Sequence, residues 1–165
     1  PYPDQSVRGG TQTDRPLLFR HEAIMQRTRA AIEASVRDYI DHLPAAEPGH
    51  PLLGTPRGEV KFAGSWSVRL HAQGFHVAHT HPVGWISSAL HVALPDASTM
   101  GGASSGWLQF GAPPPELGLD LPPYCEIEPK VGRLILFPST LWHGTVPFAD
   151  GERLSIAFDI RPPRR

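Results

Sequence analysis

The sequence has only one cysteine, Cys125, in 165 residues. A single cysteine excludes an internal disulfide framework and favours a reducing, cytoplasmic setting. No apolar run approaches the roughly 20 residues of a membrane-spanning helix, and no secretory segment opens the chain. The net charge is −1, with neither a basic stripe nor an acidic block. Nucleic acid and anionic membranes are therefore poor candidates for a partner.

The composition is that of a folded domain with many turns. Hydrophobic residues make up 40% of the chain and charged residues 19%, a balance typical of globular proteins. The 19 prolines and 16 glycines favour short strands separated by turns. The length suits one domain with its own core. Because the chain starts at Pro1 without a methionine, we expect it to be cut from a longer protein.

One stretch, residues 22–43, has a helical period. Apolar side chains recur there every three or four residues, and arginine and aspartate fill the other face. Pro44 ends the pattern because proline cannot continue a helix. Residues 1–18, by contrast, are polar and show no period. We expect the apolar stripe to pack on the core; its members are Ile24, Thr28, Ile32, Val36, Tyr39, Ile40 and Leu43.

The second half of the chain has a period of two, as in strands. The pattern covers residues 60–70, 86–94, 107–110, 133–137 and 154–160, with long loops at 96–105 and 111–130. Several strands with few helices predict a mainly β fold, a two-sheet jelly roll with the long helix on one outer face. We expect residues 1–58 to form an N-terminal loop, helix and linker. Residues 59–165 would form the jelly-roll catalytic core of the same domain.

Three histidines carry the strongest chemical signal. His79 and His81 are two residues apart, so on a strand both imidazoles point to the same side. His143 follows a later strand and turn, and a jelly roll can bring it to the other two from the opposite sheet. Three neutral imidazoles suit Fe(II), Zn, Cu or Ni and suit Mg or Ca poorly. The pattern therefore predicts a three-histidine metal site.

Arg153 lies ten residues after the third histidine and shares one face of the last strand with Ser155. Its guanidinium is a planar fork suited to a carboxylate. A buried arginine is costly unless it is paired, so an acidic co-substrate would supply its partner. The competing interpretation is a structural ion pair with Asp150, Glu152 or Asp159.

Over residues 66–160 the chain resembles the 2-oxoglutarate/Fe(II) oxygenase family, whose fold is the double-stranded β-helix. The segments that carry this resemblance are residues 66–68 (WSV), 74–82 (GFHVAHTHP), 85–92 (WISSALHV), 132–143 (GRLILFPSTLWH) and 151–159 (GERLSIAFD). Residues 6–13 (SVRGGTQT) also resemble the lead-in of members attached to tetratricopeptide arrays. This implies the C-terminal domain of a longer, repeat-containing chain.

The resemblance implies that His79 and His143 hold Fe(II), while His81 takes the ligand position that is usually a carboxylate. The implied activity is an Fe(II)- and 2-oxoglutarate-dependent dioxygenase. Such an enzyme consumes O2, releases succinate and CO2, and hydroxylates a protein or peptide side chain or a small molecule.

The same resemblance assigns the co-substrate contacts. Arg153 matches the arginine that pairs with the distal carboxylate of 2-oxoglutarate, and Ser155 matches the hydroxyl beside it. His91 falls where many relatives have a tyrosine that also touches this carboxylate.

Two alternatives remain open. One is a cupin-type metalloprotein, either a dioxygenase or isomerase without 2-oxoglutarate or a binding module. Residues 132–143 mimic the second cupin motif, but residues 83–86 lack the glutamate of the first. The other is a jelly-roll interaction module without enzymatic activity and with a degenerate site. Succinate formation would separate the oxygenase from the first alternative, and metal content from the second.

Overall fold

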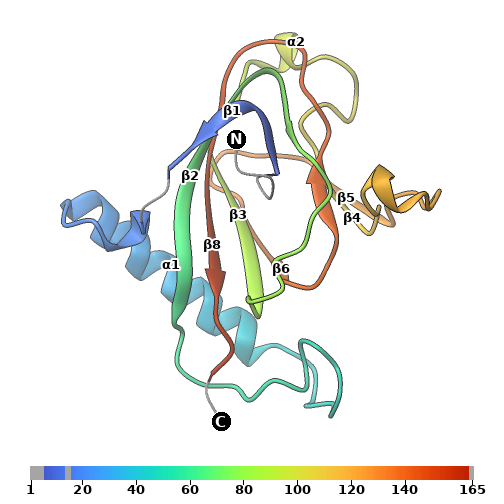
Figure 1. Cartoon of the computed structure of the whole chain (residues 1–165). Coiled ribbons are helices and arrows are strands. Elements are labelled where there is room, and N and C mark those ends of the chain that lie inside the picture. Colours follow the sequence, from blue (N-terminus) through green and yellow to red (C-terminus); the bar gives the residue numbers. More distant parts are fainter. Residues whose placement is uncertain (1–5, 14–15, 164–165) are drawn as a thin grey trace.

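The computed structural model describes residues 6–13 and 16–163 and confirms the mainly β, jelly-roll prediction (Figure 1). Within these ranges eight strands form two antiparallel sheets. The larger sheet contains β1 (Val7–Gln12), β2 (Phe62–His76), β3 (Ile86–Ala93), β6 (Leu134–Pro138) and β8 (Arg153–Ile160). The smaller sheet contains β4 (Leu108–Phe110), β5 (Cys125–Ile127) and β7 (His143–Thr145). The helical elements are α1 (Ala23–Asp41), α2 (Ala97–Met100) and the 3-10 turns η1 (Leu17–Phe19) and η2 (Pro115–Leu117).

Strand β8 occupies the middle of the larger sheet, whose order is β1-β2-β8-β3-β6. The smaller sheet has the order β5-β4-β7. Both neighbours of β8 run antiparallel to it, and they place Val68 and His91 on either side of Ser155. The side chains of β8 are therefore held in register by two long strands. No helix among the described residues is long and apolar enough to cross a bilayer.

Helix α1 lies across the outer face of the larger sheet (Figure 1). Its buried residues are Ile32, Val36 and Ile40, which form one cluster with sheet residues such as Phe158. The predicted helix and its packing are thus confirmed at these three positions. The prediction was wrong for Ile24, which is 59% exposed, because it lies in the first turn of the helix.

The polar N-terminal segment supplies a strand that its sequence does not indicate. Strand β1 pairs with β2 from Val7 opposite His76 to Gln12 opposite Val68, with an irregularity between Arg8 and Gly10. Most of its side chains are exposed, so backbone hydrogen bonds and not apolar burial hold it in place. A strand without a buried face leaves no period of two in the sequence.

We expect Ile32→Ala to destabilise the protein by about 2–5 kcal/mol, because it leaves a cavity between α1 and the sheet. Ile24→Ala is the matched control on the same helix and should change stability by no more than about 0.5 kcal/mol. Chemical denaturation of both variants measures the difference. Equal effects of the two substitutions would contradict this packing of the helix.

Candidate metal centre

The three predicted histidines meet at one place. One ring nitrogen from each of His79, His81 and His143 lies within 4.8 Å of the other two. The ring centroids of His79 and His143 are 4.2 Å apart, and that of His81 lies 5.0 and 5.1 Å from them. Metal–nitrogen bonds of about 2.0–2.1 Å need ring nitrogens that converge in this way. The cluster is therefore of a size that a single metal ion can bridge.

A backbone bridge between the two sheets produces this convergence. His79 and His143 exchange two backbone hydrogen bonds, each with an N···O distance of 3.0 Å. His143 is the first residue of β7, whereas His79 lies beyond the end of β2. The backbone N–H of His81 donates to the carbonyl of Ser139 at 2.8 Å. The histidine pair thus lies outside the regular strands, and tertiary pairing orients the two rings.

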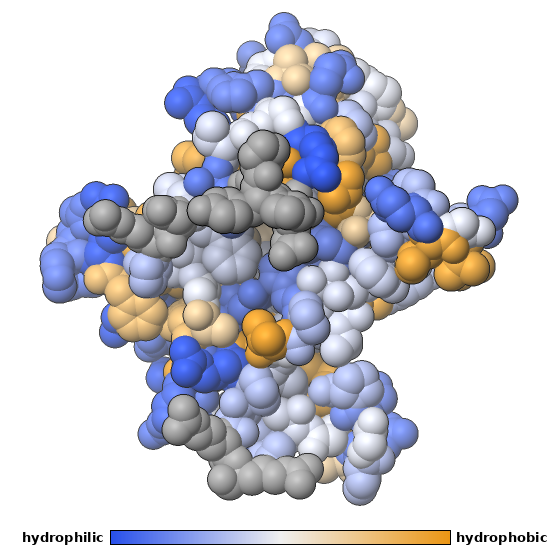
Figure 2. Space-filling model, viewed as in Figure 1, coloured by the Kyte–Doolittle hydropathy of each residue, from blue (hydrophilic) through white to orange (hydrophobic). Residues whose placement is uncertain are grey.

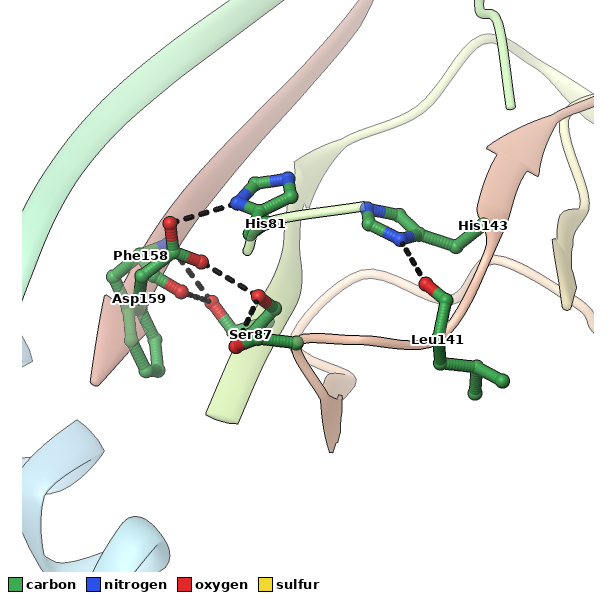
Figure 3. A network of polar contacts seen from close by, with 8 residues as sticks. His81, Ser87, Leu141, His143, Phe158 and Asp159 are labelled. Carbon is green, nitrogen blue, oxygen red and sulfur yellow. Dashed lines mark hydrogen bonds and ion pairs between the residues drawn. The ribbon is translucent and has the colours of Figure 1, made fainter. Parts of the chain in front are cut away.

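Hydrogen bonds select which nitrogen of each ring is free. Nδ1 of His79 is 2.7 Å from the carbonyl oxygen of Val77, and Nδ1 of His143 is 3.0 Å from that of Leu141. Nδ1 of His81 is 2.7 Å from a carboxylate oxygen of Asp159 (Figure 3). Because these oxygens can only accept, each Nδ1 carries a proton, so that in the neutral ring the lone pair lies on Nε2.

Two of the rings, those of His79 and His143, are also held neutral, which is the form that binds a metal. Burial lowers the pKa of His79 to about 4 and the pKa of His143 to about 2. Both lone pairs are therefore available at neutral pH without the loss of a proton. Three imidazole nitrogens fit Fe(II), Zn, Cu or Ni, so the residues present suit the metal that the sequence predicts.

The predicted co-substrate residues of β8 line the same cavity as the histidines, a space of ≈ 290 Å³. Successive residues of a strand point to opposite faces, so Ile156 and Phe158 join the core under α1. The alternate residues of β8 face inward and line the cavity; they are Arg153, Ser155, Ala157 and Asp159. One strand therefore carries a row of side chains through the interior.

Arg153 is a buried cation that lacks a carboxylate partner within the described part of the chain. Its side chain is 2% exposed, its Nη1 donates to the carbonyl of Gly106 at 2.9 Å, and its Nε has no partner there. Burial lowers its pKa to about 10, so it remains charged at neutral pH. A buried cation of this kind is stabilised by an anion that enters the cavity.

The three acidic residues that could have paired with Arg153 have other contacts. Glu152 pairs with Arg69 at 2.6 Å. Asp150 accepts a hydrogen bond from the backbone N–H of Gly151. Asp159 shares a strand face with Arg153, but six residues at about 3.3 Å each separate them by roughly 20 Å. None of these three carboxylates therefore pairs with Arg153, and its guanidinium is available to a ligand.

His91 lies on β3 opposite Ser155 and is 1% exposed. It is not among the described residues that line the cavity. Burial, followed by the charges of Arg153 and Arg133, lowers its pKa to about 3. Neither ring nitrogen has a hydrogen-bond partner in the described part of the chain, which is rare for a buried polar group. Its part in co-substrate binding stays a prediction.

Sequence reasoning missed two residues of the site. His76 lines the cavity and stacks on His79, with centroids 6.3 Å apart. Its position three residues before His79 was the available signal. Asp159 was considered only as a partner for Arg153, yet its carboxylate contacts His81. That contact joins two segments far apart in the chain, so no local pattern could reveal it.

A second hollow of ≈ 420 Å³ adjoins the first and shares His76, Gly144 and Thr145 with it. Pro113 and Pro115, in the loop that contains η2, form part of its wall. Figure 2 shows hydrophobic surface where this loop projects, at the right edge of the molecule. The leucines exposed in this loop are Leu117, Leu119 and Leu121.

The chain matches the family model described as "Putative 2OG-Fe(II) oxygenase" over residues 64–159. No curated protein matches it in sequence. Among the solved structures that share its fold are three prolyl hydroxylases. A prolyl-4-hydroxylase from Pseudomonas putida has 19% identity and a TM-score of 0.60, with 97% of this chain and 74% of that one covered.

The second is the collagen prolyl hydroxylase of Paramecium bursaria Chlorella virus-1, solved as a 2OG complex. It has 16% identity and a TM-score of 0.61, with 96% of this chain and 81% of that one covered. The third is a prolyl hydroxylase from Trichoplax adhaerens in complex with a peptide fragment of hypoxia inducible factor. It has 13% identity and a TM-score of 0.60, with 96% of this chain and 65% of that one covered. At these identities the likeness shows a common fold.

Proposed function

This chain belongs to the 2OG-Fe(II) oxygenase family, and from that premise we propose that it is an Fe(II)- and 2-oxoglutarate-dependent dioxygenase. His79, His81 and His143 would hold the metal. The observation that carries the proposal is Arg153, a cation 2% exposed that shares one cavity with three convergent imidazoles. A metal-binding module without an acidic co-substrate gives no reason for that buried charge.

Each residue has a distinct task in this proposal. Arg153 binds the distal carboxylate of 2-oxoglutarate, because its guanidinium is charged and lacks a described anionic partner. Ser155, 5% exposed and two residues along β8, offers a hydroxyl beside it. His91, which lies opposite Ser155 on β3, is neutral and can donate one hydrogen bond.

When bound, the metal and the 2-oxo acid supply the oxidising chemistry, in which O2 and 2-oxoglutarate give succinate and CO2 as substrate is hydroxylated. The chain itself orients the three ring nitrogens through their Nδ1 hydrogen bonds. The cavity wall also includes apolar side chains, among them Trp66, Leu108 and Phe137. These keep bulk water from the reacting groups.

For the substrate we propose a protein or peptide side chain. The hollow beside the metal centre and the exposed leucines of the η2 loop offer a long, partly apolar surface that leads to the cavity. Two of the structural neighbours are named as a collagen prolyl hydroxylase and as a hydroxylase bound to a peptide. A small-molecule substrate is the alternative, and peptides and metabolites that stimulate 2-oxoglutarate turnover would decide between them. We place this activity in the cytoplasm, in keeping with the free thiol of Cys125.

We expect the protein, reconstituted anaerobically with Fe(II), to convert 2-oxoglutarate to succinate once O2 is admitted. Treatment with a chelator should abolish turnover, and added Fe(II) should restore it, because the imidazoles of His79 and His143 stay neutral without the metal and can bind it again. Mass spectrometry of succinate measures the result. Metal uptake without succinate would favour the cupin-type alternative, and failure to take up any metal would favour an interaction module.

A further inference from the structure

We propose that Asp159 is a positioning residue that supplies, through His81, the negative charge that the ligand set lacks. This inference rests on the proposed metal centre. Non-haem Fe(II) oxygenases commonly use two histidines and one carboxylate. Three neutral histidines leave the full charge of the ion uncompensated, whereas one carboxylate ligand would reduce it by one.

The contact between Asp159 and His81 is short and sheltered. Oδ2 of Asp159 accepts a hydrogen bond from Nδ1 of His81 at 2.7 Å, and the two side chains are 11% and 17% exposed (Figure 3). Charged hydrogen bonds are strengthened where water is excluded. A carboxylate on the second ring nitrogen fixes the ring and makes the ligating nitrogen more basic. Asp159 therefore shifts electron density towards the ion without touching it.

His81 differs in this respect from the other two histidines. Nδ1 of His79 and Nδ1 of His143 both donate to backbone carbonyls, which are uncharged. His81 alone of the three donates to a charged acceptor in the described part of the chain. The residue at the expected carboxylate position is thus the one that a carboxylate supports. The negative charge therefore lies on the residue that supports the ligand and not on the ligand itself.

Two neighbouring elements hold the carboxylate in place. Oδ1 of Asp159 accepts a hydrogen bond from Oγ of Ser87 at 2.7 Å, and Ser87 lies opposite Asp159 in the pairing of β3 with β8. Oγ of Ser139, which is fully buried, lies 2.8 Å from Oγ of Ser87. Ser139 also binds the backbone N–H of His81 through its carbonyl. Both oxygens of Asp159 are therefore occupied, and its orientation towards His81 is fixed.

Asp159→Asn tests the charge, because the amide keeps the size of the side chain and can still accept from His81. Apo protein is titrated anaerobically with Fe(II), and with Co(II) as an oxygen-stable probe, in competition with a chelator. We expect the affinity of the variant to fall by about 10–100-fold. The Fe(III)/Fe(II) potential should shift to more positive values, because less negative charge stabilises Fe(III). Glu152→Gln, which removes an exposed carboxylate paired with Arg69, is the matched control and should change neither quantity.

A second measurement needs no variant. In the wild-type protein loaded with Zn(II), the Nδ1 proton of His81 should resonate well downfield of the Nδ1 protons of His79 and His143. A resonance of His81 among the other two would overturn the inference, as would wild-type affinity and potential in Asp159→Asn. Failure of the wild-type protein to bind any metal would instead overturn the proposed function.

Discussion

Replacement of His143 with alanine is expected to abolish stoichiometric binding of Fe(II). His143 is the proposed ligand from the smaller sheet, and its ring lies 4.2 Å from that of His79 and 5.1 Å from that of His81. Without it the remaining two nitrogens come from one short segment and enclose the ion from one side only. The affinity loss should exceed the roughly 10–100-fold that is typical of a residue that only supports a ligand.

Metal content after anaerobic reconstitution and chelator competition measure this loss. The backbone bridge between His79 and His143 uses main-chain atoms, so the alanine variant should keep the fold, and circular dichroism checks that it does. His71→Ala is the control, because this histidine is exposed on β2 and pairs with Glu152 outside the cavity. A variant lacking His143 that still binds one ion with near wild-type affinity would show that a water completes a two-histidine site.

The sequence allowed the long elements to be predicted because each buries one face. Strand β8 alternates strictly between apolar residues and polar or small ones, since its apolar face packs under α1 and its other face lines the cavity. Strands β5 and β7 have three residues each, which is too few for a period to emerge. Strand β1 is held by its backbone. Very short strands, and a strand held by backbone pairing, are thus the elements that the sequence did not reveal.

The sequence also predicted the histidine cluster of the candidate site, but not every contact within it. Residue types alone brought His79, His81 and His143 together in one hypothesis, because three imidazoles and a nearby guanidinium have few other uses in combination. The choice of partner for Asp159 was beyond the sequence. Alternation along β8 places its side chain on the same strand face as that of Arg153, but only the length of the strand and the fold around His81 decide which partner it meets.

Replacement of Arg153 with methionine should separate co-substrate binding from metal binding. We expect the KM for 2-oxoglutarate to rise roughly 100-fold or more, because removal of one partner from a buried ion pair costs about 3–5 kcal/mol and each 1.4 kcal/mol is tenfold. Affinity for Fe(II) or Co(II) should stay close to wild type, since Arg153 is not among the residues of the histidine cluster. Succinate formation against 2-oxoglutarate concentration, and metal titration of the apo protein, measure the two quantities.

In the protein without ligands, the same substitution should not weaken the protein but keep or raise its stability. Wild-type Arg153 holds a charge in a buried place, and burial lowers its pKa to about 10 because the charged form is disfavoured there. Methionine fills similar space without a charge, so the apo variant should be at least as stable as wild type. The stabilisation that 2-oxoglutarate gives to the wild-type protein in thermal unfolding should disappear. Arg69→Met, which removes an exposed arginine from its pair with Glu152, should retain that stabilisation. Loss of metal affinity as severe as the loss of co-substrate binding would contradict the separate roles of Arg153 and the three histidines.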